Sequence, residues 1–269
     1  PGAEVLFNHR VVGFEQDGAG VTVYAETPFS ILAIKADFLI AADGSNSIVR
    51  KWVGTEFDGF TYPEKFLCYT TNEPLERRIE NLAYVNYVSD PEEWMVLLRV
   101  PSLWRVLVPA EMEQPDVVLL GDAKKNDVFD RLLGDGERIV TEHRTIYRVH
   151  QRVAKSFLHG RVMLIGDAAH GIHPIAGQGF NLALRDIAQL VQQVAAYGND
   201  IGGYTMLRAY QQARQQDINI VSTATDALVR LFSNRSRPLA LARNCGLLAM
   251  TLCDDLKRPL AEQAMGLRS

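Results

Sequence analysis

Residues 161–190 read RVMLIGDAAHGIHPIAGQGFNLALRDIAQL, and this stretch decides the expected fold. The apolar run at residues 162–166 has the composition of a buried strand. It stops at Gly166 and Asp167, passes through a glycine-rich loop, and leads into a helix that we expect over residues 181–196. The first amides of such a helix are unpaired and partly positive, so the sequence predicts a site that stabilises an anionic group.

The loop itself offers two interpretations. Gly177 and Gly179 remove side chains, so that the backbone can approach a ligand closely. Asp167 can accept hydrogen bonds from ligand hydroxyls, as acidic residues of dinucleotide-binding folds accept them from ribose. Alternatively, Asp167 caps the next turn and the glycines serve backbone geometry alone. The local pattern leaves both interpretations open, since a single glycine-rich loop is weak evidence.

Periodicity predicts further elements on both sides of this stretch. A mostly antiparallel sheet is expected between about residues 66 and 109, and Gly134 is expected to end a short helix. The other segments are a hairpin at 4–24 around the turn Asp17–Gly20, a buried strand at 36–42, strands at 83–88, 94–100 and 104–108, a helix at 125–133, a helix at 204–232 and an apolar tail at 238–253.

Composition excludes several classes of function. The net charge of -4, with Lys and Arg dispersed, gives no footprint for nucleic acid. Cys68, Cys245 and Cys253 have no metal-like spacing, which suggests reduced thiols in a cytoplasmic protein. His170 and His173 lack a third ligand at suitable spacing, so no metal site is expected. No apolar run is long enough to cross a bilayer.

Two segments carry a resemblance to a known family. Residues 166–186, GDAAHGIHPIAGQGFNLALRD, resemble the second FAD motif of the class A flavoprotein monooxygenases, which include para-hydroxybenzoate hydroxylase and the ubiquinone-biosynthesis hydroxylases. Residues 42–50, ADGSNSIVR, resemble the family's Asp-Gly motif. The two motifs stand in the family's order, about 120 residues apart.

The resemblance implies an α/β (α+β mixed) protein with the FAD-binding fold of the para-hydroxybenzoate hydroxylase type and an antiparallel substrate-domain sheet. Its implied segments are 1–62, part of the FAD-binding domain with the Asp-Gly motif; 63–150, the substrate-binding sheet; 151–200, the FAD-binding domain with the Gly-Asp motif and its helix; and 201–269, carboxy-terminal helices.

The resemblance also assigns cofactor-binding residues. Asp167 would bind hydroxyls of FAD, the backbone of residues 179–181 would face the pyrimidine edge of the flavin, and Pro174 would lie beside the flavin at the substrate face. The complete implied set is Asp43, Gly44, Arg50, Gly166, Asp167, Pro174, Gly177, Gln178, Gly179, Phe180 and Asn181.

The Asp-Gly motif contains residues with competing roles. Asp43 and Arg50 would hold the motif together, with Arg50 pairing with a carboxylate or guiding the pyrophosphate of NADH or NADPH. The other interpretation of Arg50 is a surface salt bridge. Ser47 is expected to cap a helix rather than act as a nucleophile, because no acid or base accompanies it.

The chemistry implied by the resemblance belongs to the cofactor. NAD(P)H reduces FAD, O2 forms a C4a-hydroperoxyflavin, and a phenolic or quinone-precursor ring is hydroxylated. No catalytic acid or base is therefore assigned. Trp94, Trp104 and Tyr87 are candidate contacts to a small aromatic or prenylated phenolic substrate, although each is more often a core residue. The apolar tail would contact a membrane surface or a second copy of the chain, or pack as an ordinary helix.

One family feature is missing from the sequence. The first βαβ unit with its Gly-x-Gly-x-x-Gly motif is absent, so we expect a fragment that by itself binds FAD poorly. Two alternatives remain: an epoxidase, prenyl reductase or halogenase on the same scaffold, or a non-catalytic truncated binding module. The halogenase is disfavoured because no Trp-x-Trp-x-Ile-Pro segment is present.

Overall fold

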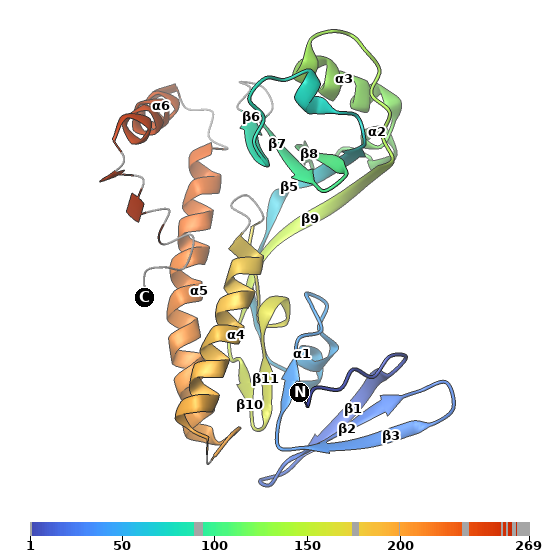
Figure 1. The fold of residues 1–269 in the computed structure, drawn as a ribbon, viewed down its shortest axis with the longest axis vertical. Helices are drawn as coiled ribbons and strands as arrows, with labels where there is room; N and C mark the ends of the chain where they lie inside the picture. Colours follow the sequence, from blue (N-terminus) through green and yellow to red (C-terminus); the bar gives the residue numbers. More distant parts are fainter. Residues whose placement is uncertain are drawn as a thin grey trace. The chain divides into compact units, whose positions relative to one another are not determined.

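A computed structural model describes residues 2–88, 94–173, 178–198, 200–232, 237–253, 255–256, 258–259 and 262. The chain divides into two units. Unit 1 comprises Pro1–Phe60 and Gln151–Ser269, and unit 2 comprises Thr61–His150. Each is described separately below, with the elements labelled as in Figure 1.

Unit 1 begins with the predicted hairpin. Strands β1 (Arg10–Gln16), β2 (Val21–Glu26) and β3 (Ile31–Ala36) form an antiparallel sheet in the order β1-β2-β3. The turn between the first two strands is closed by the Asp17 carboxylate, which accepts hydrogen bonds from the backbone N–H groups of Ala19 at 2.7 Å and Gly20 at 2.9 Å. The hairpin is confirmed, although its first strand begins at Arg10 rather than near Glu4.

A second, smaller sheet places the two motifs together. It contains β4 (Leu39–Ala41), β10 (Leu158–His159) and β11 (Val162–Leu164), in the order β10-β11-β4. Strands β11 and β4 are parallel, with Leu164 opposite Ala41. Parallel strands end at the same edge of a sheet, so the loops that follow β4 and β11 emerge side by side.

Helices complete unit 1. They are α1 (Ile48–Val53), α4 (Gln178–Ala196), α5 (Tyr204–Phe232) and α6 (Arg237–Leu252). Helices α4 and α5 lie side by side (Figure 1). Apolar clusters fill the spaces between α1, α4, α5 and the strands, with Leu182 of α4 and Ile218 of α5 fully buried. Among the described residues, no helix is long and apolar enough to cross a membrane.

Helix α4 carries apolar residues on more than one side. The spacing of Ile187, Leu190, Val191 and Val194 predicts a single apolar face, but Ile187 is 49% exposed and Val191 is 62% exposed. The buried side of α4 instead carries Leu182, Asp186 and Leu190. The helix therefore has two apolar stripes, and periodicity alone did not separate the buried stripe from the exposed one.

Unit 2 is built on the predicted antiparallel sheet, which is confirmed. The sheet runs in the order β12-β9-β5-β8-β7-β6, and its outermost strand β12 belongs to unit 1. The strands are β5 (Phe57–Thr71), β6 (Val85–Val88), β7 (Met95–Val100), β8 (Leu103–Glu111), β9 (His143–Ala154) and β12 (His170–Gly171).

One face of this sheet is covered by helices. A 3-10 turn (Leu75–Arg77), α2 (Asp116–Leu119) and α3 (Asp122–Leu133) contribute to an apolar core with the side chains of β5, β7 and β8. Gly134 ends α3 in the left-handed conformation at φ 69, as its position predicted. The core residues are Leu67, Tyr69, Leu75, Met95, Leu97, Trp104, Val106, Val108, Ala110, Leu119, Val128, Phe129 and Ile139.

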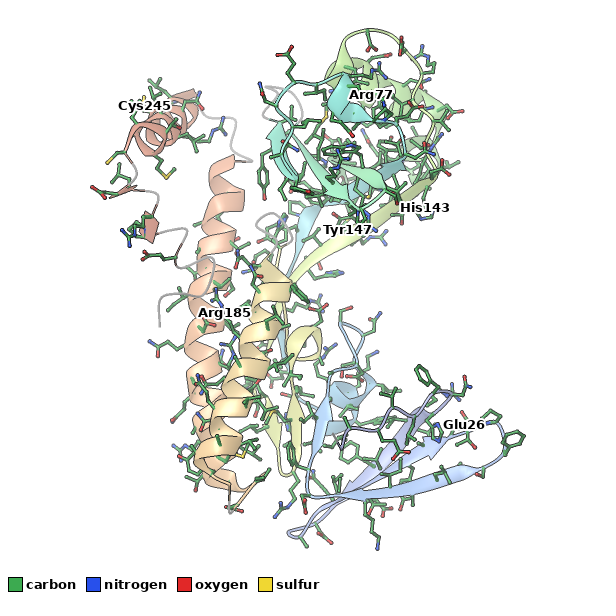
Figure 2. All side chains as sticks on the ribbon, in the orientation of Figure 1. Glu26, Arg77, His143, Tyr147, Arg185 and Cys245 are labelled. Carbon is green, nitrogen blue, oxygen red and sulfur yellow. The ribbon has the colours of Figure 1, made fainter. Side chains whose placement is uncertain are left out.

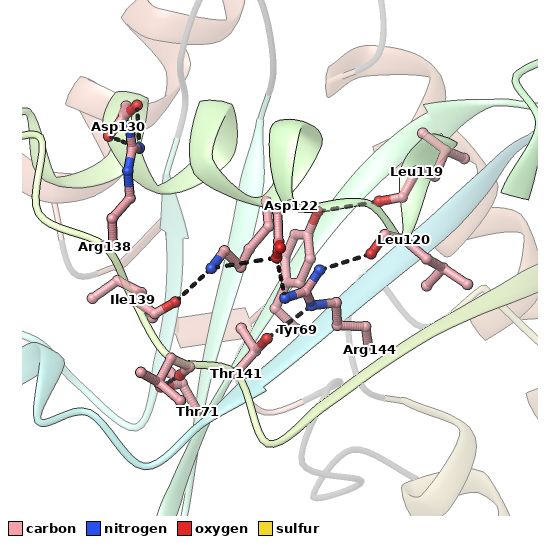
Figure 3. Close-up of polar contacts among 12 residues, drawn as sticks. Tyr69, Thr71, Leu119, Leu120, Asp122, Asp130, Arg138, Ile139, Thr141 and Arg144 are labelled. Carbon is pink, nitrogen blue, oxygen red and sulfur yellow. Dashed lines mark hydrogen bonds and ion pairs between the residues drawn. The ribbon is translucent and has the colours of Figure 1, made fainter. Parts of the chain in front are cut away.

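Polar contacts hold the helical layer of unit 2 at its margin (Figure 3). Arg144 donates to the Leu120 carbonyl oxygen at 2.8 Å and to the Asp122 carboxylate at 2.6 Å. The buried Lys125 ammonium donates to the Ile139 carbonyl oxygen at 2.8 Å. The bond to Leu120 satisfies a carbonyl that the end of α2 leaves unpaired, and the bond to Ile139 satisfies a carbonyl of the segment that leads into β9.

Candidate flavin site

The loop after β4 is organised by its own polar side chains. The Asp43 carboxylate accepts hydrogen bonds from the backbone N–H groups of Ile48 at 2.8 Å and Val49 at 3.2 Å. The Ser47 hydroxyl accepts one from the Arg50 N–H at 2.9 Å. Both side chains therefore cap α1, which confirms the expected capping role of Ser47.

Arg50 joins the two motifs. Its guanidinium donates to the Ala168 carbonyl oxygen at 2.9 Å and to the Ser45 carbonyl oxygen at 2.7 Å, and it lies 3.8 Å from the centre of the Phe57 ring. The side chain is 6% exposed, so its interpretation as a surface salt bridge is wrong. Among the described residues it forms no ion pair with a carboxylate either. Binding backbone carbonyls on both loops fixes one loop against the other.

Asp186 anchors the loop after β11 from inside. This carboxylate is 1% exposed and accepts hydrogen bonds from the Gly166 N–H at 2.7 Å, His170 Nε2 at 2.7 Å and Arg214 Nε at 2.6 Å. Burial by itself would raise the pKa of Asp186, but the bond from His170 and the charges of His170 and Arg214 outweigh it and lower the pKa. The residue is therefore ionised, and it holds both sides of the short turn Gly166–Ala168.

The anchor continues into helix α5. Arg214 also donates to Asp217 at 2.6 Å and to the Leu182 carbonyl oxygen at 3.3 Å. Arg185 extends from α4 toward α5 (Figure 2) and donates to Asp217 at 2.9 Å. Charge is thus balanced across the two helices, as a buried ion pair requires.

Asp167 has the opposite environment from Asp186. Its side chain is exposed, and within the described part of the chain it accepts no hydrogen bond. Asp167 therefore caps no turn among the described residues, and its interpretation as a capping residue finds no support there. Gly166 reaches the required backbone conformation at φ 57, which a side chain would strain. The turn therefore presents a carboxylate with unused acceptor sites.

Helix α4 comes next in the chain after this turn and the segment that follows it. The helix begins at Gln178, three residues before the expected start, so Gln178, Gly179, Phe180 and Asn181 form its first turn. Phe180 is 72% exposed. Pro174 and Gly177, also predicted site residues, lie outside the described residues.

The residues present fit a flavin dinucleotide. An exposed carboxylate with free acceptor sites suits the hydroxyls of a ribityl or ribose group. The first-turn amides of α4 suit the polar edge of a ring that becomes anionic on reduction. Gly44, at φ 82 and with open space where a side chain would be, leaves the neighbouring loop accessible.

Among the proposed substrate contacts, Trp104 is excluded. It is 3% exposed on the core side of the unit 2 sheet, and its indole N–H donates to Glu76 at 2.7 Å. Tyr87 is 55% exposed, and Trp94 packs edge-on against Phe66 with ring centres 5.5 Å apart. These two residues remain candidates.

Sequence reasoning gave no role to Asp186 and Arg214. A signal for Arg214 was available, because it falls on the buried stripe of α5 with Tyr210, Ile218 and Val221, at helical spacing. A charged residue on a buried stripe requires a partner, and Asp186 of the recognised motif was the nearest candidate on the preceding helix.

The sequence matches the family described as "FAD binding domain" over residues 1–225. The chain belongs to the FAD-binding domain family. Both motifs lie inside the matched range, and the family predicted from them is confirmed.

Several named proteins are similar in sequence to this chain. It is 33% identical over 201 residues to para-nitrophenol 4-monooxygenase of Pseudomonas sp. (strain WBC-3), covering 73% of this chain and 49% of that protein. It is 32% identical over 273 residues to ubiquinone hydroxylase UbiL of Rhodospirillum rubrum, covering 99% of this chain and 62% of that protein. The chain thus spans about half to two thirds of the length of these relatives.

Solved structures agree with this FAD-binding fold. The crystal structure of p-nitrophenol 4-monooxygenase PnpA from Pseudomonas putida DLL-E4 matches with a TM-score of 0.83 at 26% identity, over 97% of this chain and 68% of that one. Aklavinone-11 hydroxylase in a ternary complex with FAD and aklavinone matches with a TM-score of 0.73 at 23% identity, over 82% of this chain and 43% of that one. The second likeness shows the fold alone.

Proposed function

We propose that the whole protein is an FAD-dependent, NAD(P)H-using cytoplasmic monooxygenase that hydroxylates a phenolic or quinone-precursor ring with O2. The observation that carries the proposal is the contrast between two carboxylates, one in the loop after β11 and one in α4 that binds this loop. Asp186 is saturated with hydrogen bonds inside the protein, and Asp167 is left open beside the first turn of α4. The names of the relatives support an aromatic substrate, since they are hydroxylases or monooxygenases of nitrophenol, ubiquinone and hydroxyphenylpropionate type.

The bound FAD would supply the redox chemistry with NAD(P)H and O2. Asp167 would accept hydrogen bonds from hydroxyls of the cofactor. The amides of residues 178–181 would stabilise negative charge at the pyrimidine edge of the ring, an effect worth about 0.3 to 2 kcal/mol at a helix terminus. Arg50, Asp43 and Asp186 act on the loops that carry these groups and need not touch the cofactor.

The test is the substitution Asp167→Asn in the whole protein. We expect the Kd for FAD to rise about 10-fold or more, because hydrogen bonds to a charged acceptor are worth roughly 1.5 to 3 kcal/mol. The denaturation midpoint should stay unchanged, since Asp167 has no partner in the described protein. Fluorescence titration of FAD measures the first quantity.

Asp58→Asn is the matched control, because Asp58 is another exposed carboxylate of unit 1 that accepts no hydrogen bond from any described residue. It should bind FAD like the native protein. Equal FAD affinity in the Asp167→Asn protein would contradict the proposed cofactor role. Incorporation of label from ¹⁸O2 into a phenolic product tests the reaction itself, and uncoupled NAD(P)H oxidation without labelled product would contradict hydroxylation.

A further inference from the structure

Unit 1 contains a cavity outside the candidate flavin site. Its volume is about 490 Å³, and it lies between β1, helix α1 and β10. None of the residues that line it belongs to the loops after β4 and β11. Cavities that hold small organic ligands have volumes of roughly 300 to 1,000 Å³. This cavity is therefore large enough for a molecule of one or two rings.

A bulge in β1 opens the cavity. The pairing of β1 with β2 shifts between Val11 and Gly13, so that Val12 is an extra residue in the strand. Gly13 lines the cavity, and a Cβ atom added there would meet no other atom within 4 Å. The absence of a side chain at Gly13 therefore leaves space that the described residues around it do not fill.

Two aromatic residues line the cavity together. Phe14 of β1 and Trp52 of α1 lie with their ring centres 6.2 Å apart and their planes at 53° to each other. Trp52 is 39% exposed, and its indole N–H donates to no residue that the structure describes. Tilted rings of this kind pack well against a further aromatic ring, and a partly buried indole N–H usually finds an acceptor. The two rings thus favour an aromatic ligand.

His159 of β10 supplies a hydrogen-bond acceptor. Its Nε2 atom lies 3.2 Å from the Ser156 carbonyl oxygen, which can only accept, so Nε2 carries the proton. Burial lowers the pKa of His159 below its usual value, and the bond to Ser156 opposes this effect only in part. The ring is therefore neutral at pH 7, with a lone pair on Nδ1 to which no described residue donates.

Gln16 of β1 holds the histidine in place. Its side-chain oxygen accepts a hydrogen bond from the Arg161 N–H at 2.6 Å, and its side-chain nitrogen donates to the His159 carbonyl oxygen at 3.0 Å. These bonds tie β1 to the turn between β10 and β11. With His159 neutral, no residue that lines the cavity carries a charge, so the cavity favours a neutral ligand over an ion.

We propose that this cavity binds a small neutral aromatic molecule that carries a hydroxyl group. The ring would pack against Phe14 and Trp52, and the hydroxyl would donate a hydrogen bond to Nδ1 of His159. This site is separate from the candidate flavin site. The proposal therefore goes beyond the proposed function and does not depend on it.

The test uses the whole, FAD-loaded protein labelled with 5-fluorotryptophan, in which ¹⁹F NMR reports on each tryptophan. The Trp52 resonance, assigned with Trp52→Phe, reports on the cavity, and the resonances of Trp94 and Trp104 report on unit 2. The probes at pH 7 are 2-naphthol, which donates a hydrogen bond, and 2-methoxynaphthalene, which cannot. We expect a saturable shift of the Trp52 resonance, with 2-naphthol bound about 3- to 10-fold more tightly, as one neutral hydrogen bond implies.

His159→Phe should remove this preference, because phenylalanine keeps an aromatic ring but has no acceptor. In that variant 2-naphthol should bind as weakly as its methyl ether, whose Kd should stay the same. Gly13→Leu should weaken binding of both probes 10-fold or more by filling the cavity, and it tests the site even if His159→Phe lowers stability. Gly18→Leu is the matched control, since Gly18 is another glycine of unit 1 with open space around it but lies outside the cavity. It should bind both probes like the native protein.

Several outcomes would overturn the proposal. The first is a Trp52 resonance that does not shift saturably with either probe, and the second is the same Kd for both probes in the native protein. Unchanged binding in Gly13→Leu would contradict the cavity as the site. Shifts confined to Trp94 and Trp104 would assign the aromatic ligand to unit 2 instead.

Discussion

The two units bury charge in different ways. In unit 2 the core between the sheet and helix α3 consists of apolar side chains, and the buried ammonium groups of Lys65 and Lys125 pair with exposed carboxylates at its margin, those of Asp116 and Asp122. Unit 1 places Asp186, His170 and Arg214 inside, all at most 4% exposed, directly behind the loop that carries Asp167. Burying ions costs several kcal/mol each unless they are paired, so the network is a poor way to gain stability. The same buried pairs restrict the backbone of the loop after β11, which carries Asp167.

The largest expected effect comes from breaking that network. Arg214→Met leaves the Asp186 carboxylate buried without the guanidinium that pairs with it, and we expect a loss of about 3 to 5 kcal/mol in the free energy of unfolding. Urea denaturation measures it. Arg230→Met, on the same helix, removes an exposed i,i+4 pair with Asp226 and should change the free energy by less than about 0.5 kcal/mol. A small loss for Arg214→Met would remove the contrast between the two units.

Shortening one core side chain of unit 2 measures how much apolar packing stabilises that unit. Leu97 is 0% exposed in the core, and Leu97→Ala should cost about 2 to 5 kcal/mol through lost burial and the cavity left behind. Val85→Ala, on the opposite sheet face and 50% exposed, is the matched control, with an expected cost below about 1 kcal/mol. Similar costs at both positions would show that the two faces of the sheet are equally packed.

Acidification should lower the stability of unit 1 through protonation of His173. Burial lowers the pKa of this histidine from 6.5 to about 4. Between those values the unfolded chain binds a proton that the folded protein does not, so stability rises with pH in this window and falls on acidification. The contribution lost between pH 7 and pH 5 is about 2 kcal/mol.

The measurement compares unfolding free energies at pH 7 and pH 5 for the native protein, His173→Gln and His143→Gln. His173→Gln should show the smaller acid loss. His143 is exposed on β9, so its variant should follow the native protein. An unchanged acid loss in His173→Gln would assign the pH dependence to other groups.

The smallest effect is expected on the exposed stripe of α4. Val191 is 62% exposed, and Val191→Thr, which keeps the shape of the side chain, should change the free energy of unfolding by no more than about 0.5 kcal/mol. Leu182→Ala on the buried side should cost about 2 to 5 kcal/mol. A large loss for Val191→Thr would show that the stripe is covered in solution.

Local patterns were sufficient for much of the fold. The hairpin around Asp17, the antiparallel strands of unit 2 and the end of α3 at Gly134 all follow from turn chemistry and periodicity between near neighbours. Helix α4 shows the limit of prediction from local patterns. Both of its stripes are apolar, and only the elements that pack against Leu182 and Leu190 decide which stripe is buried.

By itself, the sequence determined the family and the loop in which Asp167 stands, because motif wording and residue order are properties of the chain. The tertiary structure alone decided that Asp167 accepts no hydrogen bond from the described residues while Asp186 accepts three, and that Arg50 reaches the Ala168 carbonyl across 118 residues. Burial and pairing depend on groups distant in sequence. No local pattern contains those distances, so these roles required the folded chain.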